Sequence, residues 1–247
     1  SPILPPMTLI KTPFGIAVQV TGGEPLPVRH IIGVGMNYAA HAKEQGKGVP
    51  ERPMLFTKNL MAAALNGDDI RVPKVCQDRP QVDLEAELGV IIGHRKDGRP
   101  VRDVPKAEAL SCVLGYVAAN DVSARWWQKD GSGGQFYRGK SFDTFCPIGP
   151  RVVPAAEVPD PQSLRLSSRL NGQVMQDSTT ADMIFDVATL ISEMSLGTTI
   201  LPGTLILTGT PSGVGFARTP PIFLKHGDIV EVEVAGIGTI KNKVVFE

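Results

Sequence analysis

Alternating polar and apolar residues predict a strand in the segment QVDLEAELGVIIG, residues 81–93. Because successive side chains of a strand point to opposite faces, Asp83, Glu85 and Glu87 would share one face of it. The strand then continues into a wholly apolar stretch, which is typical of a strand that enters a protein interior. Burial makes a charged carboxylate unfavourable, so this pattern requires something that offsets the charge.

Short strands separated by turns account for most of the remaining pattern. Residues 8–20, TLIKTPFGIAVQV, predict a hairpin with its turn at residues 13–15, and residues 227–247 predict a second hairpin. Residues 203–215, GTLILTGTPSGVG, predict a strand that leads into a glycine-rich turn. Residues 109–123 are compatible with either a helix end or a strand. The 26 Gly and 21 Pro residues also favour short elements over long helices.

Helical periodicity is confined to a few segments. Residues 31–34 predict a strand, which is followed by a helix that begins with Asn37 as its N-cap and ends at Gly46. Residues 182–196 predict the clearest helix. Its apolar residues recur at helical spacing: Met183, Val187, Leu190 and Met194. The whole pattern predicts a β-rich α+β fold rather than a doubly wound parallel sheet, because strands and helices do not alternate throughout.

Composition and charge narrow the classes of partner. The 25 basic and 25 acidic residues of the 247-residue chain cancel, and no basic stripe occurs, so no nucleic-acid or membrane partner is expected. No apolar run approaches the roughly 18 residues of a membrane helix, and we expect no signal peptide. Three widely spaced cysteines fit no zinc or disulfide pattern: Cys76, Cys112 and Cys146. They predict buried thiols in a reducing, cytoplasmic compartment.

The spacing of Glu85 and Glu87 is compatible with two interpretations. The pair could form the solvated face of an edge strand, and since Glu231 and Glu233 have the same spacing, spacing alone does not decide. Alternatively, the two carboxylates, with roots about 7 Å apart, could bind one metal ion if a third acid joined them. Asp121 is a candidate for this third acid, although it could instead form an Asx turn. Oxygen ligands alone favour Mg²⁺, Mn²⁺ or Ca²⁺ over Zn²⁺.

Two further candidates come from helix spacing and local sequence. His41 and Glu44 are three residues apart in a predicted helix, hence on one face and within hydrogen-bonding reach. A neutral imidazole is a competent base near pH 7, although a single histidine in a helix is more often structural. Lys140 in RGKSFDTF is equally compatible with a solvated side chain. Spacing and local sequence alone do not decide the roles of His41, Glu44 and Lys140.

Six segments resemble, in this order, the signatures of the fumarylacetoacetate hydrolase family: GVGMNYAAHAKE, DLEAELGVIIG, GYVAANDVSAR, YRGKSFDTFCPIGP, LNGQVMQDSTTADMIF and LILTGTPSGVG. The resemblance covers residues 29–245 and is strongest to single-domain members of the family. It implies a mixed β-sandwich roll flanked by short helices, with the catalytic domain over residues 29–247. Residues 1–28 would form an N-terminal hairpin extension.

The resemblance implies a metal centre. Glu85, Glu87 and Asp121 would bind a divalent cation, usually Mg²⁺ or Mn²⁺, and Ca²⁺ is also compatible with oxygen ligands. Such a cation would explain how an acidic face is tolerated in an interior strand. Glu231 and Glu233 match no family signature and keep the interpretation of a solvated face.

The resemblance also implies catalytic and substrate-binding groups. His41, oriented by Glu44, would activate a water molecule, and Lys140 would stabilise negative charge on the substrate. Three further residues would contact the substrate: Arg125, Gln128 and Thr210, with Tyr137 a weaker candidate. Trp126 departs from the family, which usually has Asp at this position, so we expect a large aromatic residue close to the pocket.

These features predict a metal-dependent hydrolase that cleaves a C–C bond of an acylpyruvate or a related 2-oxo acid or 1,3-diketone, similar to fumarylacetoacetate or fumarylpyruvate, through a metal-bound enolate. The alternatives within the family are oxaloacetate decarboxylation and keto–enol tautomerisation or isomerisation, which share the enolate but need no attacking water. A non-catalytic binding protein with the same fold is a further alternative. The family also implies a homodimer, and we expect a role in aromatic catabolism.

Overall fold

The computed structural model describes residues 7–44, 46 and 48–247. Ten strands of this part of the chain form a large sheet: β1 (Met7–Thr12), β2 (Gly15–Val20), β3 (Leu26–Pro27), β4 (His30–Gly35), β5 (Met54–Lys58), β6 (Ala63–Leu65), β9 (Ala86–Ile92), β10 (Val113–Asn120), β12 (Cys146–Pro154) and β15 (Thr204–Leu207). Their order is β3–β2–β1–β12–β10–β9–β15–β4–β5, and β6 pairs with β12. Neighbours are antiparallel except in the pairs β15–β4 and β12–β6.

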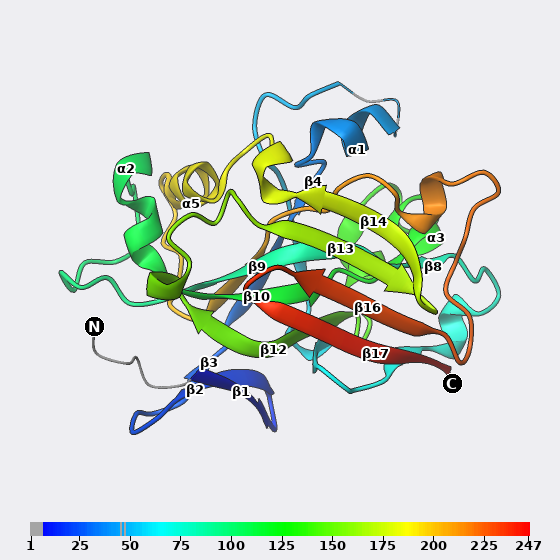
Figure 1. The fold of residues 1–247 in the computed structure, drawn as a ribbon, viewed down its shortest axis with the longest axis horizontal. Helices are drawn as coiled ribbons and strands as arrows, with labels where there is room; N and C mark the ends of the chain where they lie inside the picture. Colours follow the sequence, from blue (N-terminus) through cyan, green and yellow to red (C-terminus); the bar gives the residue numbers. More distant parts are fainter. Residues whose placement is uncertain (1–6, 45, 47) are drawn as a thin grey trace.

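A second, smaller sheet packs against one face of the large sheet (Figure 1). It contains β14 (Gln173–Thr179), β13 (Arg165–Leu170), β16 (Ile229–Val234), β17 (Gly238–Phe246) and β7 (Ile70–Val72), in this order. A two-stranded sheet joins β8 (Val82–Asp83) to β11 (Ser123–Ala124). The predicted β-rich α+β fold is therefore confirmed.

The helices in the described residues are short. The α-helices are α1 (Ala39–Glu44), α2 (Lys106–Ala109), α3 (Arg125–Gln128), α4 (Phe136–Lys140) and α5 (Val187–Ser195). The 3₁₀ turns are η1 (Leu60–Ala62), η2 (Lys74–Cys76), η3 (Leu110–Cys112), η4 (Asp130–Ser132), η5 (Ala155–Glu157), η6 (Thr180–Asp182) and η7 (Gly215–Ala217). None of these helices has the length and apolar character that a transmembrane span needs.

Apolar clusters cover both faces of the large sheet. On one face, Leu88 and Val90 of β9 belong to a cluster that includes Val232 of the smaller sheet. On the other face, Ile91 belongs to a cluster that includes Val18 of β2. Since β1, β12 and β10 lie between β2 and β9 in the strand order, this cluster extends across several strands of the sheet. The central strand β9 is consequently buried on both sides.

Most of the predicted strands are present. The two predicted hairpins are confirmed as β1–β2 and β16–β17, and the strand predicted within residues 203–215 is confirmed as β15. Residues 109–123 contain both a helix end and a strand, because η3 leads directly into β10. The three cysteines are buried free thiols, as predicted. The proposed division between residues 28 and 29 stays a prediction, and residues 1–6 lie outside the described part.

The strand predicted over residues 81–93 is interrupted. Two residues, Leu84 and Glu85, separate β8 from β9. β8 pairs with β11, whereas β9 pairs with β10 and β15, so the interruption lets the chain pass from one sheet to another. Here the N–H of Glu85 donates to the side chain of Asn120 at 3.0 Å instead of to a ladder partner.

The predicted N-cap at Asn37 is wrong. The helix begins at Ala39, and the Asn37 amide donates to the carbonyl oxygens of Phe185 at 3.0 Å and Thr208 at 2.7 Å. Its side-chain oxygen accepts the N–H of Phe185 at 2.8 Å. Bonds to distant segments therefore replace the local cap. The helix end predicted at Gly46 adjoins residues outside the described part.

The predicted helix over residues 182–196 is shorter than expected. Asp186 is its N-cap, because the carboxylate accepts the N–H of Thr189 at 2.7 Å, and α5 starts at the next residue. Met183 precedes the helix and forms an isolated bridge with Tyr38. Its helical spacing therefore reflects burial in the same core and not membership of the helix.

We expect Asn37→Ala to lower the free energy of unfolding by about 3 kcal/mol, because three buried or partly buried backbone groups would each lose a partner at about 1 kcal/mol or more. Urea denaturation followed by circular dichroism measures the change. Lys43→Ala, on the exposed side of α1, is the control and should cost less than about 0.5 kcal/mol. A cost for Asn37→Ala as small as that of the control would contradict the interpretation.

Candidate metal centre

Antiparallel pairing of β9 with β10 brings the three predicted acids together. The register places Glu87 opposite Ala119, and the N–H of Asp121, just beyond β10, donates to the carbonyl oxygen of Glu85 at 2.9 Å. Opposed residues of antiparallel strands point to the same face, so Glu85 and Asp121 start on the same side. A slip of one residue in this register would send the acids of the two strands to opposite faces.

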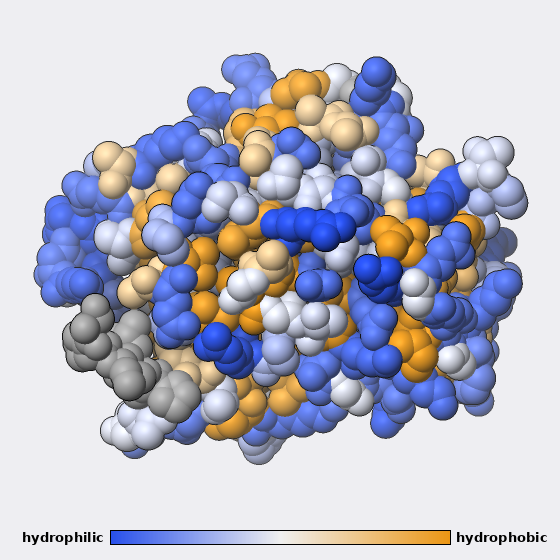
Figure 2. Space-filling view, in the orientation of Figure 1, coloured by the Kyte–Doolittle hydropathy of each residue, from blue (hydrophilic) through white to orange (hydrophobic). Residues whose placement is uncertain are grey.

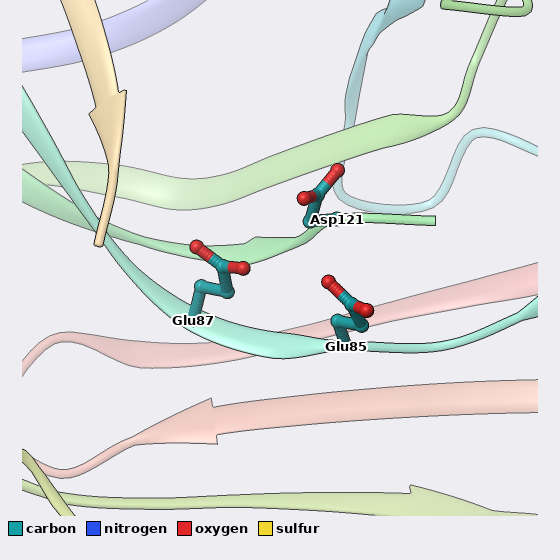
Figure 3. A group of neighbouring side chains, drawn as sticks. All are labelled: Glu85, Glu87 and Asp121. Carbon is teal, nitrogen blue, oxygen red and sulfur yellow. The ribbon is translucent and has the colours of Figure 1, made fainter. Parts of the chain in front are cut away.

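The three carboxylates converge in the interior. Ligand atoms of Glu85, Glu87 and Asp121 all lie within 4.8 Å of one another. Figure 3 shows their carboxyl groups directed into one space, two from β9 and the residue before it and one from the end of β10. Their exposed fractions are 5%, 1% and 0%. The structure therefore brings together the residues that the resemblance implied as metal ligands.

The second acidic pair with the same spacing has a different environment. Glu231 and Glu233 lie on the outer face of β16, where Glu233 is exposed and Glu231 pairs with Lys241 at 3.0 Å. Hydrophilic residues are spread widely over this side of the molecule (Figure 2). The solvated-face interpretation of this pair is confirmed.

The two buried glutamates differ in their electrostatic environment. Burial raises the pKa of Glu85, but the positive charges of Lys140 and Arg125 outweigh it and lower this pKa to about 2. Burial and the negative charges of Asp121 and Glu85 raise the pKa of Glu87 well above its usual range. Of the two glutamates, Glu87 is therefore the one that holds its proton more strongly.

This donor set fits a hard divalent cation. The groups are carboxylates only, and oxygen ligands of this kind suit Mg²⁺ or Mn²⁺ better than Zn²⁺. Oε2 of Glu87 accepts the N–H of Gly209 at 2.7 Å, which fixes the carboxylate without neutralising it. A shared cation would remove the repulsion that raises the pKa of Glu87. The site therefore supports a divalent metal, and the choice of ion stays a prediction.

Two cations predicted from the sequence border the acids. Nζ of Lys140 lies 2.8 Å from Glu85 and 2.6 Å from Asp121. Arg125 bridges Glu85 and Asp83, at 2.7 Å from each. Burial lowers the pKa of Lys140, but the charges of Asp121 and Glu85 outweigh this and raise it overall. Lys140 is therefore a fixed positive charge beside the metal centre.

Lys58 is a third buried cation, which the sequence analysis did not single out. It pairs with Asp121 and donates to the carbonyl oxygens of Phe145 at 2.7 Å and Val122 at 3.3 Å. An ammonium has three donors, so these acceptors occupy all of them and orient Asp121. The local sequence LFTKNL does not distinguish this lysine from a surface one, so its role depends on distant segments.

Asp83 does not join the metal centre, although strand alternation placed it on the acidic face. Its carboxylate binds Arg125 and accepts the N–H groups of Gly215 and Phe216, both at 2.9 Å. The interruption after β8 separates it from Glu85. Asp83 instead holds the Arg125 guanidinium in place.

A cavity of about 30 Å³ adjoins the acids. Its polar lining includes His41, Glu85, Arg125, Gln128, Lys140 and Thr210. Apolar side chains of Met54, Phe56 and Phe136 complete the wall. The structure thus gathers the predicted catalytic and substrate-contacting residues, apart from Glu44, around one small space, although their roles stay predictions.

Glu44 orients His41 from outside the cavity. Nδ1 of His41 lies 3.1 Å from one carboxylate oxygen of Glu44, and the other oxygen accepts the N–H of Gly213 at 3.0 Å. Burial raises the pKa of Glu44, but hydrogen bonds from His41 and Gly213 lower it overall. A carboxylate only accepts, so Nδ1 of His41 carries a proton and Nε2 is the basic nitrogen of the neutral ring.

Hydrogen bonds among the cavity-lining residues limit which atoms of Thr210 and Gln128 remain available to a substrate. The hydroxyl of Thr210 donates to the carbonyl oxygen of Ala86 at 2.9 Å and accepts from Gln176 at 2.7 Å. The hydroxyl proton of Thr210 is therefore already engaged. The backbone N–H of Thr210 is the donor that remains for a substrate. The side-chain oxygen of Gln128 accepts from Arg125 at 3.0 Å, which leaves its NH₂ group as a donor.

Trp126 adjoins the lining residue Arg125 but is not itself among the residues that line the cavity, so its effect on the substrate side stays a prediction. The guanidinium of Arg79 lies over its ring at 4.3 Å, and its ring contacts Gly131. Positions three apart on α3 direct Arg125 and Gln128 inward, so the residue between them points elsewhere. Tyr137 is 49% exposed and also lies outside the lining.

Comparisons with known proteins show the family to which this chain is similar. Residues 30–245 match the family described as fumarylacetoacetate (FAA) hydrolase C-terminal. The mitochondrial oxaloacetate tautomerase FAHD2A of Bos taurus is 46% identical over 215 residues, which are 87% of this chain and 66% of that protein. The chain therefore spans just under two thirds of this relative.

Two solved structures are similar over almost their whole length. Fumarylpyruvate hydrolase from Pseudomonas aeruginosa, in complex with Mn²⁺ and pyruvate, has 30% identity and a TM-score of 0.81, covering 96% of this chain and 99% of that one. 2-Hydroxyhepta-2,4-diene-1,7-dioate isomerase from Mycobacterium marinum has 33% identity and a TM-score of 0.77, covering 98% and 99%. The first of these structures contains a divalent metal ion and pyruvate, which agrees with a divalent-metal site in this fold.

We expect Glu87→Gln to weaken Mn²⁺ binding by at least about tenfold, because it removes a ligand charge, and even partners of ligands contribute factors of this size. Isothermal titration calorimetry measures the affinity. Glu233→Gln, the matched change in the solvated pair, should leave it unaltered. Equal effects of the two substitutions would refute the metal centre.

Mn²⁺ should stabilise the protein more as the pH rises. Folding raises the pKa of Glu87 above its ordinary 4.5, so metal-free stability should fall as the pH rises from there toward the raised value. The ion needs the charged carboxylate, so the Tm increase that it causes should grow over the same range. Thermal melts between about pH 5 and about pH 8, with and without Mn²⁺, measure this difference. A constant Tm increase would show that Glu87 does not ligate the ion.

Proposed function

Because the chain belongs to the fumarylacetoacetate hydrolase family, we propose that it is a divalent-metal-dependent enzyme that interconverts the keto and enol forms of a small 2-oxo acid such as oxaloacetate. The observation that carries this proposal is the cavity that His41, Lys140 and Glu85 share. It combines an oriented base, a fixed cation and a metal-ligating acid in one buried space. These are the groups that enolisation of a carbonyl compound needs.

A substrate carboxylate has suitable donors in this cavity. The guanidinium of Arg125, the amide of Gln128 and the N–H of Thr210 are the groups proposed to bind it. Glu85, Glu87 and Asp121 would hold the cation, which when bound supplies a Lewis acid that polarises the substrate oxygens. Phe56, Phe136 and Met54 limit the access of water.

The proton transfer is assigned to His41. Nε2 would take a proton from the carbon next to the 2-oxo group, while Nδ1–H keeps its hydrogen bond to Glu44. Lys140, whose pKa is raised overall, would offset the negative charge that develops on the substrate oxygen. The same proton then passes from Nε2 to that oxygen and completes the conversion of ketone to enol without consuming water.

Hydrolysis of an acylpyruvate C–C bond is the second candidate. The 3.1 Å contact between His41 and Glu44 is the arrangement that the family resemblance implied for activating water. The fumarylpyruvate hydrolase whose structure holds Mn²⁺ and pyruvate is a similar protein with that activity. Identities of 42–46% to oxaloacetate tautomerases favour tautomerisation as the first proposal.

We also propose the remaining predicted activities, the oligomeric state and the location. Oxaloacetate decarboxylation would use the same residues, and a non-catalytic binding protein would need none of the proton-transfer groups. A homodimer, a role in aromatic catabolism and a cytoplasmic location follow from the sequence analysis alone. Several of the similar tautomerases are mitochondrial proteins, so a mitochondrial location is the alternative.

We expect the protein with Mg²⁺ to accelerate conversion of enol-oxaloacetate to its keto form, followed by the loss of enol absorbance, and EDTA to abolish this activity. His41→Gln should reduce the rate by about 100-fold or more, since general base catalysis contributes factors of this size. His94→Gln, an exposed histidine outside the site, is the control and should retain full activity.

The same preparations should be assayed for pyruvate release from an acylpyruvate. Faster turnover in this assay than with oxaloacetate would favour hydrolysis over tautomerisation. Activity on neither substrate, with Mn²⁺ binding intact, would reject both and favour the binding-protein alternative.

A further inference from the structure

Gln176 of β14 connects the two sheets beneath the metal centre. Its side chain is 1% exposed and forms four hydrogen bonds. The NH₂ group donates to the Thr210 hydroxyl at 2.7 Å and to the Pro211 carbonyl at 2.9 Å. The side-chain oxygen accepts from the Ala86 N–H and the Ser168 hydroxyl, both at 2.9 Å. A carboxamide has two donors and two acceptor positions, so every position is used.

Two of these partners belong to different segments that build the site. Ala86 lies between the metal-ligating residues Glu85 and Glu87, so the bond to its N–H fixes the backbone that carries both. Thr210 follows β15 and lines the cavity. The same loop supplies the N–H of Gly209 that binds the Glu87 carboxylate at 2.7 Å.

A direct bond closes the arrangement. The Thr210 hydroxyl donates to the carbonyl oxygen of Ala86 at 2.9 Å, while it accepts from Gln176. Ala86, Thr210 and Gln176 therefore form a closed ring of hydrogen bonds. Movement of the Gln176 amide would disturb two segments together: the metal-ligand strand, which carries Glu85 and Glu87, and the Thr210 loop, which follows β15.

We propose that Gln176 is a positioning residue that sets the spacing between the metal-ligand strand and the Thr210 loop, and so governs the binding of both metal and 2-oxo acid. The second half of this statement rests on the proposed function. The residue itself touches neither, because it is absent from the cavity lining. It acts through Ala86 and Thr210.

Gln162 offers a matched comparison. Its amide also bridges distant segments, donating to the Thr180 carbonyl at 2.8 Å and accepting the Val187 N–H at 2.9 Å. Neither partner lines the cavity or belongs to the acid triad. Loss of Gln162 therefore measures the general effect of removing a bridging glutamine from this fold.

The test is calorimetric titration of Mn²⁺, and then of oxalate as a 2-oxo acid mimic at saturating Mn²⁺, for wild type, Gln176→Leu and Gln162→Leu. We expect Gln176→Leu to weaken both affinities by about tenfold or more, the size typical of residues that orient metal ligands. Gln162→Leu should stay within about twofold of wild type in both titrations, whatever its effect on Tm.

A second variant tests the proposal if Gln176→Leu does not fold. Gln176→Asn keeps the amide but is one methylene shorter, so we expect it to lose its bonds to Ala86 and Thr210 and to reproduce the loss of both affinities. Wild-type affinities in a folded Gln176 variant, or losses no larger than those of Gln162→Leu, would overturn the proposal. Failure of the wild type to bind Mn²⁺ would instead reject the metal centre and the proposed function.

Discussion

The close approach of three buried carboxylates is the constraint on which the rest of the structure depends. At separations within 4.8 Å, like charges repel by several kcal/mol even at an effective dielectric constant of about 20. Lys58, Lys140 and Arg125 are buried against these acids and offset part of this repulsion. Such an arrangement is a poor source of stability, so its presence in the central strand indicates a functional reason for it.

The scaffold around the acids explains how this charge is held in place. β9 is buried on both faces and paired on both edges, so the backbone that carries the glutamates has little freedom. The antiparallel register with β10 delivers Asp121 to the same face. The smaller sheet contributes Gln176, whose amide reaches the backbone between the two glutamates. The site therefore lies where the sheets meet, because neither sheet alone supplies all of its contacts.

One set of residues suits several reactions of 2-oxo acids. Tautomerisation, decarboxylation and C–C hydrolysis all develop negative charge on an oxygen that Lys140 and a divalent cation would stabilise. They differ in what His41 would act on under the proposed function, which is a carbon-bound proton in one case and a water molecule in another. Similar proteins with tautomerase, isomerase and hydrolase activities are consistent with this shared chemistry.

The sequence by itself determined the β-rich class, both hairpins and the family, because alternation and turn residues act locally and six signatures occur in order. It also singled out the polar residues that line the cavity, through the resemblance rather than through spacing, which did not separate Glu87 from Glu233. Only the tertiary structure decided where polar groups find their partners. Lys58 is buried against Asp121, and Asn37 binds a distant segment instead of capping a helix. Each of these outcomes depends on which remote segments fold against a residue, and local sequence carries no record of that.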